Sequence, residues 1–374
     1  MLYVHIPFCK TRCIYCAFAS STMLQLIPRY VSALCHELKC RADYLPSHAV
    51  QSVYLGGGTP SLLPNVALEQ LFTAIHQYLR LQPNAEVTVE CNPDDVTPSL
   101  VQTLRTCGVN RVSMGVQSFC DHELRLLHRR HTAQQAREAV AYLISGGIHN
   151  VSIDLMYGLP YQTLGTWQRS ITEALRLPVQ HISAYCLSVE DGTPLQMQIA
   201  QKAMDELPED LALTMFQTVC HRLLNAGFEH YEISNFCRPS YRAQHNTGYW
   251  SGLPYLGVGA AAHSYNGSER RWNTSDVRRY CEAMEHGIDC SEAEHLTFNM
   301  RYNEFVFTGL RRAEGINLQQ MEQRFGKAQL GYCLHEAQKH IAAGRLICTN
   351  NQLRLTESGI FVSDDIMSDL CLVE

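Results

Sequence analysis

The stretch HIPFCKTRCIYCAF, residues 5–18, carries three cysteines, Cys9, Cys13 and Cys16, in the spacing C-x3-C-x2-C. The chain has 16 cysteines, and no other three lie so close together. Thiolates are the protein ligands of iron–sulfur clusters, so three of them on one short loop can converge on a compact cluster. A four-iron cluster held by three cysteines keeps one iron open to an outside chelate, such as the methionine part of S-adenosylmethionine (SAM).

Two other interpretations of the loop are weaker. Cys13 and Cys16 could belong to a zinc site, but a structural zinc site takes four protein ligands and the loop offers no fourth one nearby. A redox-active C-x-x-C pair would use the same two residues and give Cys9 no role. The sequence therefore favours a [4Fe–4S] cluster on Cys9, Cys13 and Cys16, which after reduction would cleave SAM into a 5′-deoxyadenosyl radical.

The composition excludes some classes of function. The formal net charge is −6 and the sequence pI about 6.3, so nucleic acid is not an expected partner. No apolar run reaches the length of about 18 residues that a membrane span needs, and residues 1–8 lack the features of a signal peptide. We therefore expect a cytoplasmic protein with mostly reduced cysteines, while peripheral association with a membrane stays open.

Outward from the cysteine loop, the first two-thirds of the chain repeat one pattern, in which a short β-rich run ends in a loop and a helical stretch follows. Such alternation predicts a parallel sheet with right-handed crossovers. Six units fit a partial (β/α) barrel better than a full barrel of eight. The predicted strands are residues 2–5, 52–55, 86–90, 111–116, 151–156 and 181–187, and the predicted helices are residues 25–44, 67–79, 98–107, 132–145 and 165–177.

Chemically distinctive residues follow five of these strands. In such barrels the chemistry lies at the carboxyl ends of the strands. Each residue also has a plainer interpretation: the glycines can be simple turn residues, the two carboxylates can cap the next helix, and a basic pair can lie on a solvated surface. The residues are the cysteine loop, Gly56-Gly57-Gly58, Glu90, Gln117 and Asp154, with Arg129 in a basic stretch.

The remainder of the chain has a different character. A helix is predicted near residues 208–226, and from about residue 292 onward the chain reads as a small α-rich domain with a short hairpin at residues 345–355. We expect a barrel with its C-terminal extension over residues 1–270 and a small domain over residues 290–374, with the boundary between 270 and 290.

Six segments together resemble the oxygen-independent coproporphyrinogen III oxidase (HemN-like) family of radical SAM proteins, over nearly the whole chain. The resemblance implies the α/β fold of a partial (β/α)6 radical SAM barrel followed by a small α-rich, HemN-type C-terminal domain. The segments are the cysteine loop, GGGTPS (56–61), ECNP (90–93), GVQSF (115–119), IDLMYGLP (153–160) and YEISNF (231–236).

Two features resemble the haem-chaperone branch of this family. The oxidases have a further cysteine two positions after the third one, where this chain has Phe18. The segment HNTGYW, residues 245–250, matches the HNxxYW pattern that the branch is thought to use for haem. A departure is the run GVGAAAHS, residues 257–264, where relatives often have another glycine.

The resemblance also implies roles for single residues. It assigns SAM contacts to Tyr3, Gly57, Gly58, Thr59, Glu90, Gln117, Arg129 and Asp154. It assigns haem contacts to His245, Asn246, Tyr249 and Trp250, with His245 as an axial ligand of the iron. Chemistry alone favours a plainer interpretation, in which His245 and the two aromatic residues pack the barrel edge and Asn246 caps a turn; with the resemblance, the two interpretations are about level. His5 and Cys237 are weaker candidates for the axial ligand.

The function that the resemblance implies is haem binding and delivery to apo-haemoproteins, membrane respiratory proteins among them, supported by the cluster, SAM and an electron donor. The alternative is an oxygen-independent coproporphyrinogen III oxidase, which uses the SAM radical to convert two propionates to vinyl groups as protoporphyrinogen IX forms. Phe18 and the HNxxYW segment both argue against this alternative. A radical SAM enzyme with an unrelated substrate is disfavoured by the same segment.

Overall fold

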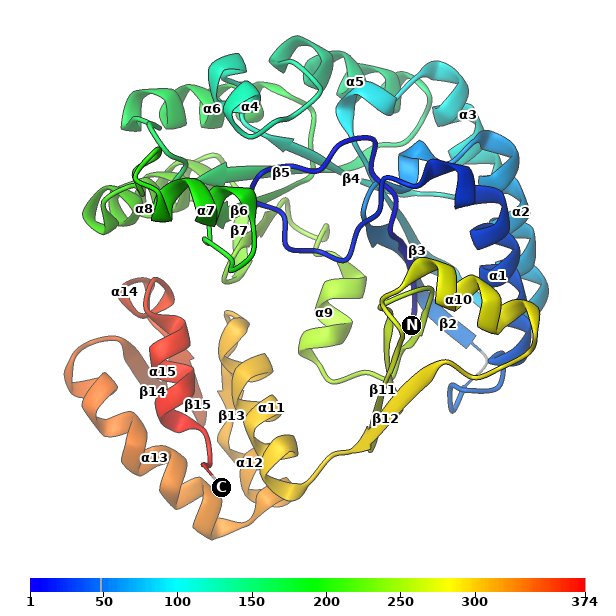
Figure 1. Cartoon of the computed structure of the whole chain (residues 1–374). Helices are drawn as coiled ribbons and strands as arrows, with labels where there is room; N and C mark the ends of the chain where they lie inside the picture. Colours follow the sequence, from blue (N-terminus) through cyan, green and yellow to red (C-terminus); the bar gives the residue numbers. More distant parts are fainter. Residues whose placement is uncertain (48, 374) are drawn as a thin grey trace.

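The computed structural model describes residues 1–47 and 49–373. Six parallel strands stand side by side in chain order, which confirms the six-unit pattern expected from the sequence (Figure 1). The sheet is open, so the partial-barrel expectation holds. The strands are β1 (Leu2–Ile6), β2 (Ala49–Gly57), β3 (Arg80–Cys91), β4 (Arg111–Gln117), β5 (Asn150–Tyr157) and β6 (His181–Cys186).

Helices follow each of the first five strands and form an arc along the outer side of the sheet (Figure 1). One helix of the first half, α4 (Asp121–Leu126), was not predicted, because six residues are too few to show a helical period. The predicted helix 25–44 is shorter than expected and ends at Cys40. The arc consists of α1 (Ile27–Cys40), α2 (Asn65–Tyr78), α3 (Pro98–Thr106), α4, α5 (Ala133–Ser145) and α6 (Leu164–Arg176).

The two faces of the sheet differ in polarity. Parallel sheets are usually apolar on both faces because helices cover both. Here the helix-covered face is apolar, as in Val53, Leu55 and Val112, which are wholly buried. The alternate residues are largely polar, and their register places Glu90 beside Ser113. The inner face is therefore a polar surface, suited to bind a polar ligand rather than to form a core.

Three short strands extend the sheet at its two edges. β7 (Glu229–Glu232) and β8 (Asn235–Cys237) add antiparallel pairing beside β6, and β9 (Leu256–Val258) pairs parallel with β1. Between them the chain forms α7 (Pro194–Ala200), α8 (Glu209–Asn225) and α9 (Gln244–Trp250). Helix α9 packs against β2 from the inner side, opposite the outer helices (Figure 1).

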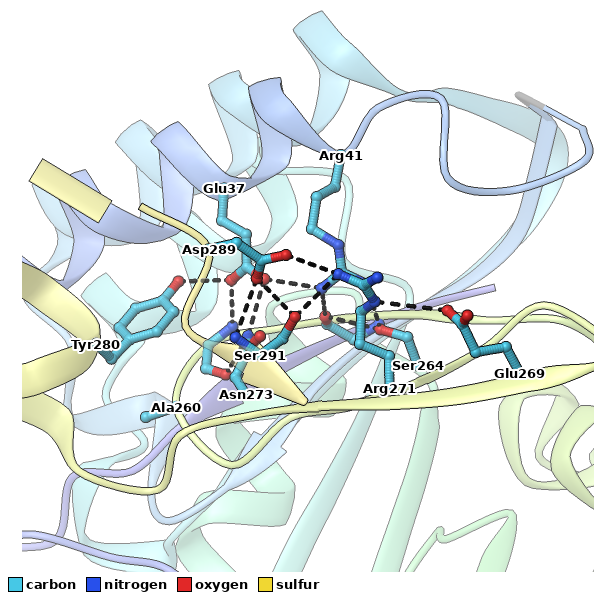
Figure 2. A network of polar contacts seen from close by, with 12 residues as sticks. Glu37, Arg41, Ala260, Ser264, Glu269, Arg271, Asn273, Tyr280, Asp289 and Ser291 are labelled. Carbon is cyan, nitrogen blue, oxygen red and sulfur yellow. Dashed lines mark hydrogen bonds and ion pairs between the residues drawn. The ribbon is translucent and has the colours of Figure 1, made fainter. Parts of the chain in front are cut away.

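A polar network anchors the loop after β9 to the outer helix α1, as Figure 2 shows. The buried Glu37 carboxylate accepts hydrogen bonds from Asn273 Nδ2 at 2.8 Å, Tyr280 Oη at 2.7 Å and the backbone N–H of Gly259 at 2.8 Å. Arg41 pairs with the same carboxylate at 2.9 Å. The segment after β9 forms helix α10 (Val277–Glu285) and a separate sheet of three strands. These strands are β10 (His263–Tyr265), β11 (Glu269–Asn273) and β12 (Ser291–His295), and none of the four elements was predicted.

The last part of the chain packs around a second hydrophobic core that includes Tyr302, Met321 and Ile366. The hairpin of β14 (Leu346–Thr349) and β15 (Gln352–Leu355) confirms the predicted one and pairs with β13 (Ile316–Asn317). The division of the chain between residues 270 and 290 stays a prediction. The helices are α11 (Phe298–Arg311), α12 (Leu318–Phe325), α13 (Lys327–Ala342), α14 (Glu357–Ile360) and α15 (Ser363–Leu370).

Among the helices of the described residues, none combines the length and the apolar character that crossing a bilayer requires.

Candidate functional site

The cysteine loop leaves the carboxyl end of β1 and is closed at its base. Phe8 and Ser21 form an isolated parallel bridge, and the Cys9 N–H donates to the Ser21 carbonyl at 3.0 Å. Between these points the loop crosses the sheet (Figure 1). Cys9, Cys13 and Cys16 are free and half-buried.

The thiols lie in one electrostatic environment. Burial raises the pKa of Cys16, and the nearby Cys13 and Cys9 raise it further. Arg129 Nη1 lies 3.4 Å from Cys13 Sγ, and the Thr59 hydroxyl lies 3.6 Å from Cys9 Sγ. A cation and a hydroxyl beside three thiols fit an anionic cluster, although no group of three or more His, Cys, Asp or Glu in the described part of the chain is already arranged as a metal site.

The glycine loop after β2 packs directly beneath the cysteine loop. Gly57 has φ +106°, and a Cβ there would lie 2.4 Å from His5 Cε1. The Gly58 N–H donates to the Ile6 carbonyl and the Thr59 N–H to the Phe8 carbonyl, both at 2.8 Å. The requirement for glycine in this loop therefore comes from the positive φ of Gly57 and from the close approach of the loop to β1 and the start of the cysteine loop.

Glu90 stands at the end of β3 and does not cap a helix. Its carboxylate accepts hydrogen bonds from Tyr54 Oη at 2.7 Å and from the Gly57 N–H at 3.1 Å. Burial raises the pKa of Glu90 to about 7, against the effect of the Tyr54 bond, and Asp154 raises it further. At neutral pH a nearby cation, such as the ammonium of an amino acid, would favour the ionised form.

Arg129 lies beside the cluster loop and not on a surface basic face. Its Nη2 donates to the Gly115 carbonyl at 2.5 Å and to Asn92 Oδ1. A Cβ at Gly115 would lie 2.9 Å from Gln117 Nε2 and 3.2 Å from Arg129 Nη2, so a larger residue there would displace the ends of both side chains. Gln117 has φ +65° at a bulge in β4, a strained backbone of the kind that clusters at functional sites.

Asp154 and Tyr3 complete the residues predicted to contact SAM. Burial raises the pKa of Asp154, while hydrogen bonds from Ser183 and Ser113 and the charges of Arg111 and Arg129 lower it. Tyr3 lies on β1 on the same face as Tyr54, with ring centroids 6.3 Å apart, and its hydroxyl lies 3.0 Å from His5 Nδ1. The structure thus brings the eight predicted SAM residues to one end of the inner face.

His245 is buried within the protein, with 1 % of its surface exposed. Its Nδ1 lies 2.9 Å from Ser52 Oγ and its Nε2 lies 3.0 Å from Tyr249 Oη. Burial lowers its pKa to about 3, so the ring is neutral at pH 7. Both ring nitrogens have partners in the protein, and in this geometry neither is available to an iron ion.

The start of α9 is capped by a residue far away in the sequence. The Glu86 carboxylate on β3 accepts from the N–H groups of Gln244 at 3.0 Å and His245 at 3.1 Å. Asn246 lies inside the first turn and does not cap it, so that part of the packing interpretation is wrong. Trp250, at the other end of α9, lies under the guanidinium of Arg311, with Arg311 Cζ 4.5 Å from the ring centroid.

A second serine–histidine–tyrosine chain was missed by sequence reasoning. His181 on β6 lies 2.7 Å from Ser152 Oγ and 2.8 Å from Tyr231 Oη. Burial lowers its pKa well below the usual value. The three residues lie far apart in the sequence, so no spacing signal marks them.

The two weaker candidates for an axial ligand of haem iron, His5 and Cys237, are also occupied or enclosed. The His5 ring is hydrogen-bonded to Tyr3 and to the Ala19 carbonyl, and Cys237 is wholly buried.

A cleft of about 670 Å³ opens between the carboxyl ends of β5 and β6 and the C-terminal domain. This volume is within the range of about 300–1,000 Å³ that is usual for small-molecule sites. Sequence analysis missed it because its walls come from segments that lie far apart in the sequence, and only the fold brings these together. Its lining includes Tyr157, Tyr185, Cys186, Phe216, Arg311 and Phe361.

The open parallel sheet, the cysteine loop after its first strand and the polar inner face define a radical SAM protein, a class whose members hold a [4Fe–4S] cluster and SAM. Models of two families match the chain: the radical SAM superfamily over residues 3–174 and the HemN C-terminal domain over residues 296–362.

Similar proteins narrow the class. The heme chaperone HemW of Mycobacterium tuberculosis is 35% identical over 99% of this chain and 94% of its own length, and that of Lactococcus lactis is 33% identical over 99% and 97%. The structure of the Escherichia coli coproporphyrinogen III oxidase HemN, a radical SAM enzyme, shares the fold with a TM-score of 0.85 at 21% identity, covering 99% of this chain and 89% of that one. The chain belongs to the HemW family.

Proposed function

We propose that this protein is a haem chaperone that binds haem and delivers it to apo-haemoproteins, with a [4Fe–4S] cluster and SAM as its cofactors. The observation that carries the proposal is the similarity to HemW chaperones over almost the whole length of both chains. Phe18, which is 69 % exposed in the cysteine loop, agrees with this choice, since the oxidases have a cysteine there.

In this proposal Cys9, Cys13 and Cys16 hold the cluster, which supplies one-electron chemistry to SAM. Arg129 and Thr59 stabilise the thiolates by the contacts described above. The inner face then orients SAM. The Glu90 carboxylate binds its ammonium, the backbone of the glycine loop lies against its methionine part, and Gln117 and Asp154 hold its polar groups.

Haem is proposed to bind next to α9, the helix that carries the HNxxYW segment. His245 would have to exchange its bond to Tyr249 for one to iron before it could act as an axial ligand. That role stays a prediction. Replacing His245 with alanine and finding an unchanged haem spectrum and affinity would remove it as a ligand.

The test of the function has two parts. In the first, the anaerobic, cluster-loaded protein is mixed with haem and then with an apo-haemoprotein, and transfer is followed by the spectrum of the acceptor. Transfer that is faster than from haem bound to serum albumin supports the proposal. Transfer no faster than from that donor would refute it.

The second part tests the oxidase, the alternative that shares the same fold. The protein is incubated with SAM, a strong reductant and coproporphyrinogen III, beside a known oxidase as a positive control. We expect no protoporphyrinogen IX. Product formed at a rate close to that of the control would make the protein an enzyme of haem synthesis and refute the proposed chaperone function.

A further inference from the structure

Arg311 has more hydrogen-bonding capacity than the protein uses. It is the last residue of α11 and lines the cleft of about 670 Å³. Its guanidinium has five N–H donors, yet its nearest carboxylate is Glu232 Oε2 at 3.7 Å, beyond hydrogen-bond distance. Its Nε is enclosed, but the side chain as a whole is 31 % exposed where it lines the cleft, so its terminal amino groups are the donors that a ligand could reach. A guanidinium N–H without a protein partner gains a charge-assisted hydrogen bond when an anionic ligand binds.

The surroundings hold both the side chain and the backbone of Arg311. Trp250 stacks under the guanidinium with a Cζ-to-centroid distance of 4.5 Å, and the backbone carbonyl of Arg311 accepts from the Ile233 N–H at 3.0 Å. Trp250 does not itself line the cleft, so its part is to hold the guanidinium flat from behind. An arginine held flat in the wall of a cleft is suited to a planar, bidentate anion, and a carboxylate has that shape.

The other walls of the cleft fit a flat apolar body. Tyr157, Phe216 and Phe361 line it, and Tyr185 is 39 % exposed at its mouth. Acidic residues, Glu206, Glu209 and Asp364, are exposed at the outer rim. An anionic group is therefore favoured only on the side of Arg311, and the opposite end favours an apolar or cationic edge.

We propose that this cleft is the haem site and that Arg311, held flat by Trp250, binds a haem propionate. The inference rests on the proposed function, since it identifies where the carried haem lies. It also gives the HNxxYW segment a role through its tryptophan rather than through the enclosed His245.

The test compares haemin with its dimethyl ester, in which both propionates are esterified. Anaerobic titrations of the full chain measure the dissociation constant of each from the Soret band. We expect the wild type to bind haemin about 10- to 100-fold more tightly than the ester, the range typical for a charge-assisted hydrogen bond. We expect Arg311→Gln to lose this preference, because its affinity for haemin falls while its affinity for the ester does not change. We expect Arg311→Lys to retain part of the preference.

Arg301→Gln is the matched control, because Arg301 is an exposed arginine on the same helix. It should leave both constants unchanged. Haemin binding that is equal in wild type and Arg311→Gln, or a loss that is equal for haemin and ester, would overturn the site while leaving the chaperone function intact. A wild type that binds neither compound would overturn both. If Arg311→Gln fails to fold, Arg311→Lys decides the matter: weaker binding of haemin with unchanged binding of the ester supports the site, and unchanged binding of both overturns it.

Discussion

Replacing His245 with glutamine should make the protein less sensitive to acid. The His245 ring is enclosed between Ser52 and Tyr249, and burial lowers its pKa to about 3 from the ordinary value of 6.5. In the unfolded chain the ring takes up a proton near pH 6.5, whereas the folded chain does not until about pH 3. The contribution to stability is therefore complete above pH 6.5 and is lost as the pH falls below it.

The size of the effect follows from the two pKa values. As the pH falls from 8 to 5, the unfolded chain binds a proton at this histidine and the folded chain does not. This difference lowers the free energy of unfolding by about 2 kcal/mol. Other buried histidines, such as His131, whose pKa burial lowers to about 3, add to the acid sensitivity of the wild type. They remain in the variant, so the difference between the two proteins isolates His245.

The assay is urea unfolding of anaerobic samples at pH 8, 7, 6 and 5, followed by circular dichroism. His245→Gln should be less stable at pH 8 by about 1–3 kcal/mol, because one or both hydroxyl partners lose their bond. This gap should shrink by about 2 kcal/mol at pH 5. His122→Gln, which changes an exposed residue of α4, is the control. A gap that stays constant from pH 8 to pH 5 would show that the ring is not held neutral, and would refute the reasoning.

Three further predictions concern the cofactor site. Cys13→Ser should lose the iron and the visible absorption of the reconstituted protein, whereas Cys40→Ser, an exposed cysteine on α1, should retain both; equal iron contents would contradict the assignment. Gly57→Ala should cost about 1–3 kcal/mol and weaken SAM binding, since φ is +106° and its Cβ would strike His5, while Gly331→Ala, with no atom near its Cβ, should be neutral or stabilising in thermal unfolding. Because the pKa of Glu90 is raised to about 7, its carboxylate ionises as the pH rises from 6 to 8, and SAM affinity measured by calorimetry should rise over that range in the wild type; a rise that persists in Glu90→Gln would exclude this group as the cause.

Much of the barrel could be predicted because its signals are local. Each strand of the first half is a short β-rich run next to a turn, and the cysteine loop is a contiguous motif. The region from residue 229 to 295 could not be predicted in the same way. Its strands have three to five residues, too short for a clear alternation, and they form only because β6, β1 and one another offer edges to pair with.

In the candidate site, too, residues with a local sequence signal could be predicted, and contacts between distant segments could not. Glu90, Gln117 and Asp154 were found because a strand end is visible in the sequence, and parallel strands bring their carboxyl ends to one edge. The state of His245 was not visible, because its partners lie on β2 and in α9 and its enclosure depends on packing. Glu86 as the cap of α9 is a contact across 158 residues.

The sequence by itself determined the class of the protein: three thiols on one loop, a glycine turn one unit later, and the order of strands and helices. These depend on neighbours along the chain, so spacing and period reveal them. Only the tertiary structure decided that the inner face of the sheet is polar, that both nitrogens of His245 are occupied, and that Arg311, stacked on Trp250, lines a cleft. Burial and pairing between distant segments are properties of the packed chain, and no local pattern records them.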